Sequence, residues 1–165
     1  MELTEGGLMH SKIFQLSKEP IEEDELMTES YFLATDCDYT GGGFVGTVAD
    51  YVSSISENAQ KQEITEFVKA FKNGIEYHEE DNYFVVVDKK EIFKEDFHDF
   101  STTMEGFSIK EFVNKSWANR IKDIISPTFS WYVYTDLCWE PYTDFFRTVK
   151  TGERYYFGAV LDYHC

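Results

Sequence analysis

The sequence has few prolines, few cysteines, few basic side chains and no long apolar run. Only 3 of the 165 residues are proline, and no Pro-, Ser- or Gln-rich stretch marks a linker. The three cysteines are odd in number and lack the close spacing of a disulfide framework or a zinc site, so we expect a reduced, cytoplasmic protein. No apolar stretch approaches the ~20 residues that a membrane-spanning helix needs, and the first residues lack the features of a signal peptide.

Basic side chains are scarce compared with acidic ones. The chain has 15 Lys and Arg against 31 Asp and Glu, a formal net charge of -16. The excess is concentrated early, since residues 1–60 carry 12 acidic and 2 basic side chains whereas residues 101–165 carry 8 and 7. Such a surface repels nucleic-acid phosphates and anionic lipids and attracts basic protein surfaces. We therefore expect a basic protein partner and no direct binding to nucleic acid or membrane.

The composition is that of a folded chain. Hydrophobic residues make up 42% and aromatic residues 18% of the sequence, whereas disordered acidic chains lack the aromatic side chains that offset chain entropy. A chain of this length fits one domain with one substantial core.

The first residues suggest a translated leader. Glu5-Gly6-Gly7-Leu8-Met9 can be encoded by GAA GGA GGT TTA ATG, which contains a bacterial ribosome-binding sequence before a start codon. We expect residues 1–8 to be a translated leader or a disordered segment and residues 9–165 to be a single α+β domain. An ordinary glycine turn is the alternative, and the nucleotide sequence of the gene distinguishes the two.

The hydrophobic pattern predicts an α+β fold with a mixed or antiparallel sheet of about five strands and four or five helices. Strands are expected over residues 11–17, 75–78, 83–87, 129–135 and 154–162. Helices are expected over residues 44–55, 64–71, 88–104, 108–125 and 141–150, the last being ambiguous with a strand. The acidic stretch 18–30 is expected to be a loop or an irregular helix.

Two groups of acidic side chains are the candidate partner-binding residues. The first group consists of Glu19, Glu22, Glu23, Asp24, Glu25, Glu29, Asp36 and Asp38. The second group consists of Glu79, Glu80 and Asp81.

The sequence contains no catalytic motif and implies no cofactor and no metal. The run from Asp36 to Gly41 resembles the first half of an EF-hand loop, but Thr47 stands where the bidentate Glu belongs, so we expect a turn. The histidines lack metal-binding spacing and are expected on the surface, with His164 at a fraying chain end.

An aromatic run follows the expected helices. Alternation along the strand at 129–135 places Trp131 and Val133 on one side and Tyr132 and Tyr134 on the other. Either these sides are core and a partly covered sheet face, or they form an exposed aromatic surface for a protein partner.

With its opening Ser11-Lys12-Ile13-Phe14-Gln15-Leu16-Ser17, its size, its charge and its lack of catalytic motifs, the chain resembles small acidic proteins of phages and bacterial mobile elements. These include anti-CRISPR and anti-restriction proteins. The resemblance implies that the chain is a DNA mimic, an inhibitor that occupies the basic nucleic-acid-binding surface of a CRISPR or restriction nuclease. Steric or allosteric contact is also compatible with the resemblance.

Two other interpretations remain open. One is a small cytosolic enzyme with a carboxylate-based, metal-assisted site around Asp36, Asp38 and Asp50. The other is an acidic domain whose charge only maintains solubility.

Overall fold

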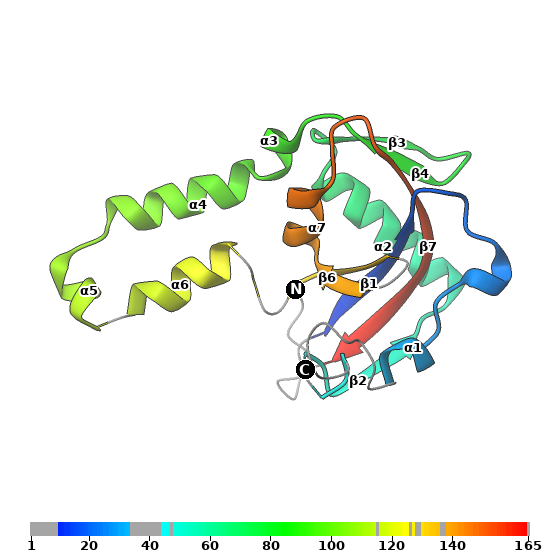
Figure 1. Cartoon of the computed structure of the whole chain (residues 1–165), viewed down its shortest axis with the longest axis horizontal. Helices are drawn as coiled ribbons and strands as arrows, with labels where there is room; N and C mark the ends of the chain where they lie inside the picture. Colours follow the sequence, from blue (N-terminus) through cyan, green and yellow to red (C-terminus); the bar gives the residue numbers. More distant parts are fainter. Residues whose placement is uncertain are drawn as a thin grey trace.

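The computed structural model describes residues 10–33, 44–46, 48–114, 116–125, 127, 130–135 and 138–164. These residues form a mixed seven-stranded sheet in the order β3-β4-β7-β1-β5-β6, with β2 also paired to β7 (Figure 1). The strands are β1 His10–Ser17, β2 Tyr51–Ser54, β3 Ile75–His78, β4 Tyr83–Val86, β5 Tyr132–Thr135, β6 Cys138–Pro141 and β7 Arg154–His164. The expected α+β class is confirmed, although the sheet has more strands than the five predicted.

The described residues contain seven α-helices and one short 3-10 helix. They are η1 Glu23–Glu25, α1 Ser30–Leu33, α2 Glu57–Ala70, α3 Lys89–Ile92, α4 Lys94–Glu105, α5 Ile109–Asn114, α6 Ser116–Ile125 and α7 Tyr142–Thr148. The number exceeds the prediction partly because each helix expected over 88–104 and 108–125 is divided in two. None of the helices in the described part of the chain is long and apolar enough to cross a membrane.

The sheet carries a hydrophobic core on each face, because side chains alternate between the two sides of a strand. On one face Phe14 and Val160 pack with apolar side chains of α2 and α7, and Phe67 of α2 is fully buried there. On the other face Ile13 and Leu161 pack with residues of the segments that follow β1 and precede β2. Strands β1 and β7 therefore run through the middle of the molecule.

The predicted helix over residues 44–55 is wrong. Tyr51–Ser54 instead forms β2, which pairs antiparallel with the last residues of β7. Strand β7 is 11 residues long, and β4 pairs only with its first part, Arg154 to Tyr156. Strand β2 pairs with Leu161 to His164 farther along β7, and between the two strands the Phe157 N–H donates to the Asn82 carbonyl oxygen and the Val160 N–H to the Gln60 side chain.

Other strands also differ from the prediction, among them β5, which begins at Tyr132 instead of residue 129. Strand β6 was not predicted, and its Pro141 is typical of the edge position that β6 occupies beside β5. Strand β7 continues to His164, two residues beyond the predicted end. The hairpin of β3 and β4 and the helix within 141–150 are confirmed.

Helices α4, α5 and α6 form a helical arm, residues 94–125, that extends away from the sheet (Figure 1). Its base is joined to the sheet region where the Arg147 guanidinium of α7 donates to the carbonyl oxygen of Ile125. The arm exposes apolar side chains, among them Phe97 at 68% and Ile109 at 78%. The apolar side chains of the arm are therefore only partly covered.

Candidate functional site

The side chain of Gln15 holds the first acidic segment, residues 18–29, against the sheet. Its Nε2 donates to the carbonyl oxygen of Glu25 (2.8 Å). Its Oε1 accepts from the backbone N–H of Met27 (2.9 Å) and of Ala159 in β7 (3.2 Å). Gln15 is buried, so these three backbone groups have a partner away from water. The segment is thus tied to both central strands.

A second amide side chain, Asn82, holds the other acidic segment, the turn 79–82 between β3 and β4. Asn82 has a φ of 53°, in the left-handed region that Asn adopts more readily than most residues. Its Nδ2 donates to the carbonyl oxygen of Phe157 (3.2 Å), and its own carbonyl oxygen accepts from the Phe157 N–H (2.9 Å). Its Oδ1 accepts from the hydroxyl of Tyr77 (2.9 Å). The turn is therefore fixed to β7.

Both acidic segments leave the sheet at the same end of β7. Ser17 of β1 and Tyr83 of β4 pair with Tyr156 on opposite edges of β7. The first segment begins directly after Ser17, and the second ends directly before Tyr83. Both segments lie on the right in Figure 1, away from the helical arm on the left. We call this surface the acidic end; its members are Glu19, Glu22, Glu23, Asp24, Glu25, Glu79, Glu80 and Asp81.

The carboxylates of the acidic end are exposed, and none forms an ion pair with another described residue. The basic side chains nearby have other contacts. The Nζ of Lys18 lies 3.0 Å from a carboxylate oxygen of Glu153, and the Arg154 guanidinium lies over the Tyr83 ring at 4.7 Å. The surface therefore keeps its negative charge.

One member of the acidic end, Glu25, also has a local role, and the predicted carboxylates outside the acidic end lie elsewhere. Glu25 accepts from the backbone N–H of Glu22 (3.1 Å) and so closes the turn of η1. Glu29 lies apart from the acidic end and accepts from the backbone N–H of Ser54 (2.7 Å), a bond that holds the pKa of Glu29 below its ordinary value. Asp36 and Asp38 lie outside the described residues.

A cluster of polar side chains occupies the opposite end of the β1–β7 strand pair. It consists of His10, Lys12, Asp162 and His164 and is called the His–Asp cluster below. His10 pairs with His164 and Lys12 with Asp162 in the antiparallel register, so all four side chains lie on one face of the sheet. The Oδ2 of Asp162 lies 3.0 Å from Nδ1 of His10 and 2.8 Å from Nε2 of His164. Its Oδ1 accepts from Nζ of Lys12 at 2.7 Å.

The prediction of surface histidines with a fraying His164 is wrong for this cluster. His164 is only 7% exposed, because it lies within β7 and its ring stacks on Tyr51 of β2 (4.0 Å, 17°). Asp162 and His164 are two residues apart on a strand, and so are His10 and Lys12. This spacing is the signal in the sequence that could have grouped each pair on one face.

Burial and charge act in opposite directions on the His–Asp cluster. Burial raises the pKa of Asp162, but the hydrogen bonds from Lys12 and His10 outweigh it and leave that pKa below its ordinary value. Burial lowers the pKa of His164, although the carboxylate of Asp162 opposes the shift. The structure therefore favours a charged Asp162 and a neutral His164.

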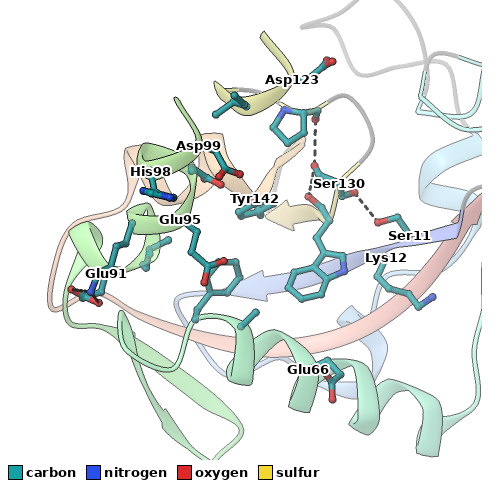
Figure 2. Close-up of a pocket in the computed structure, with 18 of the residues that line it drawn as sticks. Ser11, Lys12, Glu66, Glu91, Glu95, His98, Asp99, Asp123, Ser130 and Tyr142 are labelled. Carbon is teal, nitrogen blue, oxygen red and sulfur yellow. Dashed lines mark hydrogen bonds and ion pairs between the residues drawn. The ribbon is translucent and has the colours of Figure 1, made fainter. Parts of the chain in front are cut away.

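A cleft of about 1580 Å³ separates the sheet and α2 from the helical arm (Figure 2). His10 and Lys12 of β1 line it, and Figure 2 shows Glu95, His98 and Asp99 on α4 across from Lys12. The acidic side chains of its lining are Glu63, Glu66, Glu91, Glu95, Asp96, Asp99 and Asp123. The basic ones are Lys12, Lys94 and Arg120. The cleft is thus a second acidic surface.

Burial in the cleft changes two further groups. It raises the pKa of Asp96, and it raises the pKa of Tyr142 to about 12. Burial in the cleft therefore favours the neutral form of the Asp96 carboxyl.

The aromatic run does not form an exposed surface. Trp131 and Val133 pack into the core on the α2 face, and Tyr132 and Tyr134 pack on the opposite face. The predicted alternation is therefore confirmed, and both sides are covered.

The carboxylate-based enzyme site is represented in the described residues by Asp50 alone. Asp50 is exposed, and its backbone N–H donates to the carbonyl oxygen of His164 (2.7 Å). This backbone hydrogen bond places Asp50 next to the His–Asp cluster. The sequence did not indicate that cluster.

Comparisons with known protein families, with curated proteins and with solved structures give no match for this chain.

Proposed function

We propose that the chain is a binding protein that uses its acidic end to occupy the basic nucleic-acid-binding surface of another protein, a CRISPR or restriction nuclease being the expected target. The observation that carries the proposal is the convergence of two acidic segments at one end of β7. Each segment is tied by an amide side chain, Gln15 or Asn82, to the stretch Phe157–Ala159.

Fixed and unpaired carboxylates suit this role. Charges without intramolecular partners contribute to the long-range field that accelerates association with a cationic surface. A backbone already held in place loses less conformational entropy on binding than a flexible acidic tail would. Lys and Arg side chains that hold DNA phosphates can then pair with carboxylates instead.

Charge reversal on the acidic end tests the proposal. The triple variant Glu19→Lys/Glu23→Lys/Asp24→Lys changes three exposed side chains and spares Glu22 and Glu25, whose carboxylates close the turn of η1. The matched control, Asp99→Lys/Glu105→Lys/Asp123→Lys, changes the net charge equally but lies on the helical arm. Circular dichroism and urea denaturation establish that both variants fold.

The measurement is capture of partners from a nuclease-treated bacterial lysate, followed by competition with duplex DNA. We expect the unmodified chain and the control variant to retain a DNA-binding protein that excess duplex releases, and the test variant to lose it. Retention should fall steeply as salt rises. Equal retention by the two variants would assign binding to another surface, and partners that duplex DNA never displaces would reject the nucleic-acid-mimic function.

A further inference from the structure

The His–Asp cluster resembles the ligand set of a metal site in both geometry and chemistry. The ligand atoms of His10, Asp162 and His164 all lie within 4.8 Å of one another. In protein zinc sites the nitrogen and oxygen ligands lie at roughly 2.0–2.2 Å from the ion, which places neighbouring ligand atoms of a tetrahedral site about 3.4 Å apart. The separations of 3.0 Å and 2.8 Å between Asp162 Oδ2 and the two imidazole nitrogens are hydrogen-bond distances, and a movement of about half an ångström opens the cluster to this spacing.

The surroundings hold these side chains in place. The centroids of the His10 and His164 rings lie 3.7 Å apart in an edge-to-face contact, and the Tyr51 ring stacks on His164. The Oδ1 of Asp162 accepts from Nζ of Lys12, and its Oδ2 lies beside both histidines. A site whose ligands are already oriented needs little reorganisation to bind an ion.

The kind of ion follows from the ligand types. Two imidazoles and one carboxylate suit zinc and the neighbouring divalent transition metals, whereas calcium and magnesium prefer oxygen ligands alone. Three protein ligands also leave coordination positions for water or another molecule. His10 lies on the wall of the cleft, so an ion bound there is within reach of molecules that enter the cleft.

We propose that His10, Asp162 and His164 bind one divalent transition-metal ion, with Zn²⁺ as the reference ion. This site lies at the end of the β1–β7 pair away from the acidic end, and it is independent of the proposed inhibitory function. Lys12 has a defined part in it, because its positive charge beside Asp162 opposes the incoming cation.

The test is isothermal titration calorimetry of Zn²⁺ into the full chain after treatment with a chelator. Cys37, Cys138 and Cys165 are changed to serine in every protein compared, because thiolates also bind zinc. We expect one site per chain. His10→Ala should weaken binding by at least about 100-fold. His10 is the histidine of choice because its side chain is 32% exposed and its removal leaves the buried part of the cluster in place.

Two matched variants make the result specific. His98→Ala removes an exposed histidine from the opposite wall of the cleft and should leave the affinity unchanged. Lys12→Met should strengthen binding about tenfold, because it removes a cation beside the ligand carboxylate. A gain of affinity cannot result from misfolding.

Three results would overturn the proposal. The first is a dissociation constant weaker than about 1 mM for the chain with intact histidines. The second is equal weakening by His10→Ala and His98→Ala. The third is unchanged or lower affinity in Lys12→Met, which would remove Asp162 from the ligand set. The visible absorption spectrum of the Co²⁺-loaded chain gives a second readout, since it reports coordination by nitrogen and oxygen directly.

Discussion

The two ends of the β1–β7 strand pair carry charge in opposite ways. At the His–Asp cluster, Lys12 and Asp162 are mostly buried, with side chains 17% and 11% exposed, and they contact each other. At the acidic end, the carboxylates are exposed and lack ion-pair partners among the described residues. The neutral amides Gln15 and Asn82 fix that end to β7, together with the exposed ion pair of Lys18 and Glu153.

Buried, paired charges and exposed, unpaired charges have different consequences, the first for the stability of the fold and the second for binding to a partner. A buried pair adds little to stability in itself, but breaking it leaves a charge without water or a partner, which costs a great deal. An exposed and unpaired carboxylate costs the fold little and remains free to attract a cation. One end of the strand pair is therefore sensitive to substitution, and the other is available for binding.

Loss of the buried carboxylate should have the largest effect on stability. We expect Asp162→Ala to lower the free energy of unfolding by about 3 kcal/mol, because Lys12 and both histidines lose their shared partner. The double variant Lys12→Met/Asp162→Leu should recover most of that loss, since it removes the charge from both strands. Urea denaturation measures both values, and a loss below about 1 kcal/mol in the single variant would show that the cluster is better hydrated than its burial implies.

Loss of the anchoring amide of the acidic end should come next. Gln15→Leu keeps the volume but leaves the Glu25 carbonyl and the Met27 and Ala159 N–H groups without their partner, at an expected cost of about 2 kcal/mol. Hydrogen exchange of the Met27 amide should accelerate with it. Gln62→Leu, on the exposed side of α2, is the control and should change neither value.

Acid should weaken the acidic end through Glu153. Bonds from the Lys150 N–H, Lys18 and Tyr155 lower the pKa of Glu153 from 4.5 to about 2. A carboxyl whose pKa is lower in the folded chain stabilises the fold above its unfolded pKa and loses that contribution as the pH falls. Glu153→Gln should therefore flatten the fall in unfolding free energy between pH 4.5 and 2, by about one bound proton. Parallel curves for the two proteins in urea titrations across this range would contradict the assignment.

The elements with strong local signals were predictable from the sequence. The spacing of Ile64 and Phe67 predicted helix α2, but only over 64–71, whereas the helix runs over Glu57–Ala70 with its N-cap at Ser56. Strand β2 was not predictable, because it forms where the distant strand β7 leaves an edge unpaired. The spacing of Val48, Tyr51 and Val52 suits a helix face until that edge is known.

In the candidate sites, too, the local features were predictable from the sequence and the long-range contacts were not. The acidic residues of the acidic end were visible as charge runs, but their convergence depends on the pairing of Ser17 and Tyr83 with one residue of β7. The His–Asp cluster joins His10 and Asp162, which are 152 positions apart. No local pattern predicts such a contact, because the strand register that creates it is a property of the folded sheet.

Neutralising the acidic end should have the smallest effect on stability. The triple variant Glu19→Gln/Glu23→Gln/Asp24→Asn should change the free energy of unfolding by less than about 0.5 kcal/mol, since these exposed side chains form no ion pair with another described residue, and Glu22 and Glu25, which close the turn of η1, are kept. Any change should be stabilising at low salt and vanish at high salt, because the substitutions relieve repulsion among like charges. Urea denaturation at two salt concentrations measures it. A loss above about 1 kcal/mol would mean that these carboxylates stabilise the fold, and they would then not be free for a partner.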